Sequence, residues 1–384
     1  MAIVILLLQM AACTGFGAAV LWALKIDRDL TALQLAVFGF ALGVGVLGWL
    51  LFFLGVNEWF GQYELTAVLL TGVLGLSVFF KKKEPIVRLR HEPFSGLEKG
   101  LLLVVVLTLV LDLPEGLAPP SDGDSLAYHF ALVKQFLAAG KIEFVPRTVD
   151  GAVPLLVQMT YLPVLALGGE KAMTLWAMVS GWAAGGLLYV LSRDHLGRGW
   201  SLAVTLVFMT TPAVIYGAGS GQVEIRNALF VMLGAFAVGR IMDRHDIRYL
   251  ILAGICAGFF MAGKYTGLMF ATSGGLTLVM HRQWFTRGVI FSIVALAVGF
   301  QWYYWNWLHT GDPVFPALYN LLGNDDMGVW NQAHDEYFKK QIAVEEIAVS
   351  QNLFWLLAYP FKATLNGAQI FESGRTGFGP YVLL

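Results

Sequence analysis

The chain has little charge and almost no cysteine. Only 13% of its 384 residues are Asp, Glu, Lys or Arg, against about 25% in a typical soluble protein. Cys13 and Cys256 both lie in apolar runs, so we expect two buried thiols and neither a disulfide framework nor a cysteine-based metal site. No basic residue precedes the first apolar run, which argues against a cleaved secretory signal.

Apolar sequence is what the chain has in abundance. Hydrophobic residues make up 57% of it, and the mean hydropathy is +0.67. Runs long enough, or nearly long enough, to span a bilayer lie at residues 2–24, 31–54, 62–80, 97–113, 171–192, 199–217, 224–241, 248–263, 266–281 and 286–303. We therefore predict an all-α polytopic membrane protein with about ten or more transmembrane helices. The final residues, 378–384, are again apolar, and we expect the natural chain to continue into a further helix.

The distribution of basic residues predicts the orientation. Five short loops, at 25–29, 81–99, 193–198, 240–248 and 282–287, hold 15 of the 25 Lys and Arg residues but 8 of the 26 acids. Loops rich in Lys and Arg face the cytoplasm. We therefore expect a protein of a bacterial inner membrane, with its N-terminus and the segments near 122 and after 303 outside. The Lys81-Lys82-Lys83 run serves this orientation, and we expect no nucleic acid partner.

Two cytoplasmic loops must be joined by an even number of membrane crossings, and this limits how the segment after residue 113 can be placed. The runs at 97–113 and 171–192 already return the chain to the cytoplasmic side, so the apolar piece at 153–164 should not cross. We expect it to lie in the outer interface or to re-enter from it. Residues 125–139 form a first interfacial helix in this reading, with Asp122 or Asp124 as N-cap and a turn at Gly140.

Ionisable residues gather at the outer ends of the predicted helices. They are Asp122, Asp124, His129 and Lys134 in the first loop, Glu224 and Arg226 after a Gly-rich turn, Lys264 beside Tyr265, and His309 with Asp312. Charges this close to a bilayer are costly, so their convergence on one face indicates a functional site.

Carboxylates together with cations at this surface suit group transfer from a lipid phosphate. A carboxylate can take the proton of an acceptor hydroxyl, and cations can stabilise a leaving phosphate. The residues alone leave other readings open. Asp124 and Asp122 could only cap a helix or could share a divalent cation, Glu224 and Arg226 could simply pair, and Asp312 fits a turn former.

Three segments resemble motifs of the GT-C superfamily of integral membrane glycosyltransferases. They are Asp124-Ser125-Leu126-Ala127-Tyr128-His129 with Lys134, then Gly258 to Leu268 around Lys264-Tyr265, and Trp305 to Pro316. The similarity covers about residues 97–320 and is nearest to family 39, the branch of the protein O-mannosyltransferases and lipid A aminoarabinose transferases. Two departures stand out: three helices precede the acidic loop instead of one, and Glu224 stands where that branch often has Asp.

The resemblance implies a polyprenyl-phosphate-sugar-dependent glycosyltransferase that acts on an extracytoplasmic acceptor. Asp124 and Glu224 are the candidate catalytic residues. The candidate substrate-binding residues are Asp122, His129, Arg226, Lys264 and Tyr265. No cofactor is required by this reading, although a divalent cation at Asp122 and Asp124 stays open. We expect Asp124, Glu224 and Lys264 to line one cavity.

The chain divides, in this reading, into an added N-terminal unit at 1–96 and a GT-C-like core at 97–384. The N-terminal unit, through residues 1–80, could bind partners in a membrane complex. Two other functions remain: a non-catalytic, transferase-like subunit of such a complex, and a transporter or flippase of a lipid-linked substrate. A transporter typically has charges at mid-membrane and a repeated half, and neither is evident.

Overall fold

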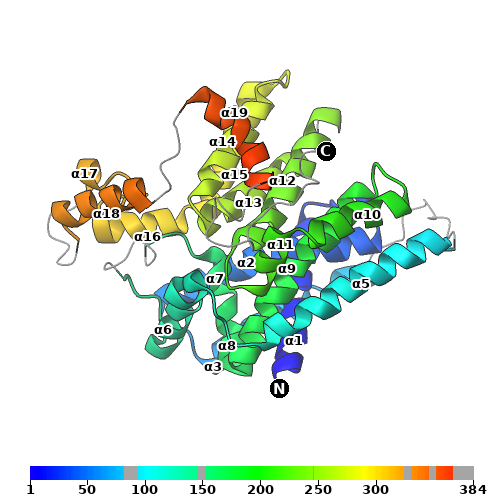
Figure 1. The fold of residues 1–384 in the computed structure, drawn as a ribbon, viewed down its shortest axis with the longest axis horizontal. Helices are drawn as coiled ribbons and strands as arrows, with labels where there is room; N and C mark the ends of the chain where they lie inside the picture. Colours follow the sequence, from blue (N-terminus) through cyan, green and yellow to red (C-terminus); the bar gives the residue numbers. More distant parts are fainter. Residues whose placement is uncertain (82–92, 146–151, 245, 324–329, 346–351, 366–384) are drawn as a thin grey trace.

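The computed structural model describes residues 1–81, 93–145, 152–244, 246–323, 330–345 and 352–365. Over these ranges the regular structure is helical, with no strand, and the protein is an all-α polytopic membrane protein as predicted. The ribbon in Figure 1 shows α5 running along the molecule beside α9 and α10. Part of the basic run, Lys82 and Lys83 with Arg88 and Arg90, lies outside the described residues.

The first part of the chain supplies five helices and the loop of interest. They are α1 (Ala2–Ala23), α2 (Ala32–Val56), α3 (Gln62–Leu74), α4 (Ser77–Lys81) and α5 (Gly96–Leu117). Two short turns of other kinds accompany them, a 3₁₀ turn at Asp27–Asp29 and a π-helix at Ser125–His129.

The middle of the chain forms the centre of the bundle. Its helices are α6 (Ala131–Ala139), α7 (Leu156–Met159), α8 (Tyr161–Gly168), α9 (Glu170–Ser192), α10 (Arg198–Met209), α11 (Pro212–Gly219), α12 (Glu224–Arg244) and α13 (Ile247–Gly263). The predicted turn at Gly140 is confirmed, since this residue has a φ of 73° in the left-handed region where glycine is least strained.

The last helices are α14 (Thr266–Leu278), α15 (Trp284–Gly299), α16 (Gln301–Thr310), α17 (Tyr319–Leu322), α18 (Gln332–Glu345) and α19 (Leu353–Leu365). Within the described ranges, six helices are long and apolar enough to span a membrane, or eight if two bent pairs count as single spans. The sequence predicted about ten. The count is lower because helices such as α14 are short: its 13 residues rise only about 20 Å.

Two predicted spans are bent in the middle. The run at 199–217 breaks before Pro212 into α10 and α11, which meet at 69°, and the run at 286–303 breaks at Phe300 into α15 and α16, which meet at 62°. The break before Pro212 is expected, because proline has no N–H to donate and disfavours helix in the residue before it. It turns the end of α11 toward the acidic loop.

Glycines bring α1 into close contact with α2. A Cβ at Gly43 would lie 1.7 Å from the carbonyl oxygen of Cys13, and one at Gly17 would lie 1.9 Å from that of Gly39. Small residues allow helix backbones to approach in this way. Both helices also contribute to the main buried cluster together with α7, α9, α12 and α13, so they pack into the bundle centre. The division at residue 96 stays a prediction.

Replacing Gly43 with Val should destabilise the protein by at least about 2 kcal/mol, since the two backbones must separate to admit the side chain. The free energy of unfolding can be measured by denaturant titration in mild detergent. Gly275→Val in α14 is the matched control, because a Cβ there meets nothing within 4 Å. Equal stability of the two variants would contradict this account of the contact.

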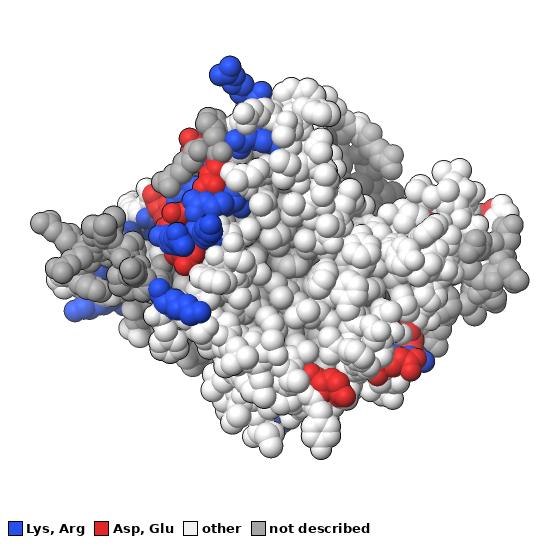
Figure 2. Space-filling view, turned by 180° about the vertical axis from the view of Figure 1, so that it is seen from behind, with Lys and Arg blue, Asp and Glu red and all other residues white. Residues whose placement is uncertain are grey.

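Ion pairs join several predicted cytoplasmic loops at one end of the bundle. Arg248 contacts Asp29 at 2.8 Å, Arg240 contacts Asp194 at 2.8 Å, and Arg198 contacts Glu98 at 2.8 Å. Figure 2 shows most charged side chains of one face gathered in separate groups, with a wide uncharged area between them. α5 begins beside this end and rises about 33 Å over its 22 residues. The acidic loop that follows α5 therefore lies far from these basic loops.

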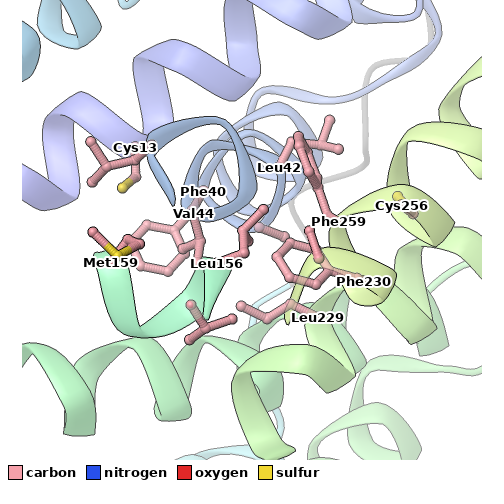
Figure 3. Close-up of a cluster of buried hydrophobic side chains, with 14 of the residues drawn as sticks. Cys13, Phe40, Leu42, Val44, Leu156, Met159, Leu229, Phe230, Cys256 and Phe259 are labelled. Carbon is pink, nitrogen blue, oxygen red and sulfur yellow. The ribbon is translucent and has the colours of Figure 1, made fainter. Parts of the chain in front are cut away.

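The apolar piece at 153–164 enters the protein interior. Leu156 and Met159 of α7 pack with Phe40 of α2 and Phe230 of α12 in one buried cluster (Figure 3). Cys13 and Cys256 are buried free thiols on different sides of this cluster, as expected. Other helices therefore enclose this piece, and its position relative to the membrane stays a prediction.

Polar side chains satisfy the backbone where α7 ends and α8 begins. The Gln9 amide donates to the carbonyl of Thr160 at 2.8 Å, and the Trp176 indole donates to the Thr160 hydroxyl at 2.9 Å. All three residues are buried. A helix break inside a membrane protein needs such partners, because lipid offers none.

Candidate functional site

A π-helical turn shapes the acidic loop. The Asp122 carboxylate accepts the N–H of Ser125 at 2.9 Å, so Asp122 caps the turn. The chain then widens into the π-helix, where the N–H of Phe130 donates to the carbonyl of Ser125 at 3.0 Å. Such turns occur often at functional sites because the additional residue redirects the side chains around it. Here the turn lies between Asp124 and His129.

The loop before α12 docks directly on this turn. The N–H of Gly221 donates to the Ser125 hydroxyl at 2.7 Å, and the Tyr161 hydroxyl donates to the Gly221 carbonyl at 3.0 Å. A Cβ at Gly221 would lie 2.7 Å from the Phe130 ring, so only glycine fits this approach. The local sequence gives no sign that Ser125, Gly221 and Tyr161 meet, because these contacts join segments far apart in the chain.

Asp124 lies exposed at the edge of this junction. The Gln222 amide is 3.4 Å from the Asp124 carboxylate and 3.4 Å from the Tyr216 hydroxyl. Partial burial raises the pKa of Asp124, the carboxylates of Asp122 and Glu224 raise it further, and Lys264 opposes them. A carboxylate with a raised pKa is a better proton acceptor than an ordinary aspartate.

Glu224 and Lys264 form an ion pair across two helices. Glu224 begins α12, and Lys264 directly follows α13. Their side chains keep 48% and 39% of their surface exposed, so a ligand can reach both. The pair lies close enough to Asp124 and His129 for both charges to act on the pKa of each. The structure thus brings together four of the predicted residues.

His129 is buried, with 1% of its surface exposed. Its Nδ1 lies 3.1 Å from the Gln158 amide nitrogen, and its Nε2 has no hydrogen-bond partner among the described residues. Burial lowers the pKa of His129 to about 3, so the ring is neutral at physiological pH. A buried polar atom without a partner is costly unless a ligand or water completes it.

Arg226 is wholly buried, and protein acceptors engage all of its donors. Its guanidinium donates to the Ser180 hydroxyl at 3.1 Å. The remaining acceptors are the backbone carbonyls of Ala177, Gly217, Ala218 and Gln222. These five contacts use every N–H that a guanidinium has. Arg226 therefore fastens the end of α11 to α9, and a substrate could contact it only if these bonds broke.

Other predicted residues lie apart from this group. The Tyr265 hydroxyl donates to the Phe315 carbonyl at 2.8 Å and accepts from Asn306 at 2.8 Å, which ties α14 to the segment after α16. Lys134, from the resembling motif, pairs with Glu170 at 2.6 Å. The contacts found for these two side chains are with protein groups other than Asp124 and the Glu224–Lys264 pair.

His309 and Asp312 hold the segment after α16. Asp312 accepts the N–H groups of Val314 and Leu318 at 2.8 Å each, which fits the turn-forming role that the sequence left open. The His309 ring stacks on Phe144, with 4.8 Å between the ring centres.

A cavity of about 60 Å³ adjoins the site. It lies between the end of α5, the acidic loop, the first turn of α9 and the end of α11, and Asp122 forms part of its wall. Asp124, Glu224 and Lys264 do not line this cavity. The described part of the chain contains no group of three or more His, Cys, Asp or Glu side chains placed to hold a metal ion.

Comparison with known proteins gives one match. The profile of glycosyltransferase family 87 matches residues 152–358, which contain Glu224, Arg226, Lys264 and Tyr265 but not the acidic loop. Searches of curated proteins and of solved structures found no match. Because the match covers more than half of this polytopic helical chain, the protein belongs to glycosyltransferase family 87.

Proposed function

We propose that the protein transfers a sugar from a polyprenyl-phosphate carrier to an acceptor on the extracytoplasmic side of a bacterial inner membrane. The observation that carries the proposal is the placement of Asp124 beside the accessible Glu224–Lys264 pair. Membership of family 87 supports the reaction class. The gathering of basic loops at the other end of the bundle supports the orientation.

The residues suggest one inverting step. Asp124 takes the proton of an acceptor hydroxyl, and the acceptor oxygen bonds to the anomeric carbon of the sugar. The bond from that carbon to the phosphate oxygen breaks, and its electron pair leaves with the lipid phosphate. Lys264 then exchanges part of its interaction with Glu224 for one with the phosphate. Glu224 orients sugar hydroxyls, while Arg226 positions the loop beside Asp124.

The test is a comparison of donors. The full chain in lipid nanodiscs should transfer label from a polyprenyl-monophosphate sugar to added glycoside acceptors and should not use nucleotide sugars. A lipid-linked donor is expected because its tail lies in the bilayer and brings its phosphate to the exposed cation of the Glu224–Lys264 pair. Transfer from a nucleotide sugar would contradict the proposal. Absence of transfer from any donor would favour the non-catalytic subunit instead.

The pH dependence of transfer should change when Asp122 is replaced by Asn. Asp124 must be deprotonated to act as a base, so activity falls as the pH drops through its raised pKa. Asp122 is one of the charges that raise this pKa, and Asn removes the charge while it can still cap the turn. The acidic limb of the pH–rate profile should therefore move to lower pH.

The opposite shift is expected for Lys264→Met, because Lys264 lowers the pKa of Asp124. The acidic limb of the pH–rate profile of Lys264→Met should move to higher pH, and its KM for the donor should rise. Profiles that shift in the same direction in both variants would be inconsistent with Asp124 as the titrating base.

A further inference from the structure

The cavity beside the acidic loop has a distinct chemical character. Two acidic residues, Glu115 and Asp122, line it together with the hydroxyl-bearing residues Ser121, Thr174, Tyr216 and Ser220. No Lys, Arg or His is among the residues that line it. At about 60 Å³ it admits several water-sized groups. Such a wall accepts and donates hydrogen bonds to hydroxyls, and its charge repels anions.

The cavity is connected to the proposed base. Asp122 in its wall is two residues from Asp124, and the Gln222 amide lies between the Tyr216 hydroxyl of the wall and the Asp124 carboxylate, 3.4 Å from each. A single side chain, that of Gln222, therefore separates a group held in the cavity from Asp124. The Glu224–Lys264 pair, which we assign to the donor, is not part of this wall.

Glu115 lies against the end of α11. A Cβ at Gly219 would lie 2.4 Å from the carboxyl carbon of Glu115, so the Glu115 side chain and the backbone of Gly219 are in close contact. The same end of α11 is held in place by the guanidinium of Arg226, which binds the carbonyls of Gly217 and Ala218 at 2.9 Å each. Arg226 thus holds in place the end of α11 that forms one side of the cavity.

We propose that this cavity is the acceptor subsite and that it receives a neutral, hydroxyl-rich group, the edge of a carbohydrate ring. The inference rests on the proposed function, since it assigns the hydroxyl nearest Asp124 as the attacking group. That hydroxyl loses its proton to Asp124 as its oxygen replaces the phosphate oxygen on the anomeric carbon. An acceptor with a carboxylate or phosphate at this position is disfavoured by Glu115 and Asp122.

Ligand binding and transfer can be measured separately. The full chain in nanodiscs is probed by saturation-transfer NMR with methyl glycosides of neutral hexoses and pentoses and with the matched methyl uronosides. Ala118→Leu fills the cavity from an exposed wall position, and Ala138→Leu, exposed on α6 and outside the wall, is its control. Glu115→Gln removes one wall charge with little change of shape.

A neutral glycoside should bind the wild type and Ala138→Leu, and its affinity should fall about tenfold in Ala118→Leu. The uronosides should bind more weakly, and Glu115→Gln should narrow that difference. The inference is overturned if no neutral glycoside binds the wild type, if uronosides bind equally well, or if Ala118→Leu changes nothing. Binding as expected without transfer from any polyprenyl-phosphate sugar would refute the proposed function alone.

Discussion

Replacing Asp124 with Asn should lower kcat for sugar transfer by about 10²- to 10⁴-fold, the usual contribution of a general base. The KM for the donor should change little, because the Glu224–Lys264 pair remains in place. The fold should persist, since the capping contact of this loop comes from Asp122 and not from Asp124. The measurement is steady-state transfer from a labelled polyprenyl-phosphate sugar in nanodiscs.

Asp122→Asn is the matched control for this loss. It makes the same chemical change two residues earlier and keeps the cap. Because Asp122 lines the proposed acceptor cavity, the KM for the acceptor should change and the pH profile should move, but kcat should not show the loss expected for Asp124→Asn. Turnover in Asp124→Asn close to that of the wild type, at unchanged stability, would remove Asp124 from the mechanism.

Replacing Arg226 with Met should reduce the free energy of unfolding by more than about 3 kcal/mol. The substitution removes the donor of five acceptors. The Ala177 carbonyl still accepts the Ser180 hydroxyl, but the buried carbonyls of Gly217 and Ala218 are left unsatisfied at about 1–3 kcal/mol each, and packing of the guanidinium is lost as well. Denaturant titration in mild detergent measures the loss. Arg226→Lys should be intermediate, because it keeps the charge but has only three donors.

Arg240→Met provides the comparison on the same helix. Arg240 pairs with Asp194 at the partly exposed end of α12, where a pair contributes about 0–1 kcal/mol. If Arg226→Met proved no more destabilising than Arg240→Met, the guanidinium would not be fastening α11 to α9.

The hydrophobic pattern predicted where the helices lie because burial in a membrane needs long apolar runs. It could not predict how they bend or how many cross. The run at 199–217 contains Pro212, yet only the structure shows a bend of 69° there that sends the end of α11 to the acidic loop. The alternation of basic loops predicted that 153–164 does not cross, but it could not predict that α7 would pack between α2 and α13.

The candidate site was predictable as a set of charged residues but not as a set of contacts. Because Asp124, Glu224 and Lys264 lie at the outer ends of predicted helices, the sequence predicted that they would share one face of the membrane. Nothing in the local sequence shows that Ser125 meets Gly221 or that Gln158 lies beside His129, because 96 and 29 residues separate these pairs. Arg226 illustrates the same limit: its type indicated a phosphate ligand, whereas its surroundings make it a structural donor.

The contacts of Arg226 also bear on how the chain is assembled during synthesis. All five acceptors, from Ala177 to Gln222, precede it in the sequence. When α12 leaves the ribosome and enters the bilayer, the partners of its buried cation have already been made. The guanidinium can therefore pass directly into a completed site, and it need not wait in lipid for a later helix.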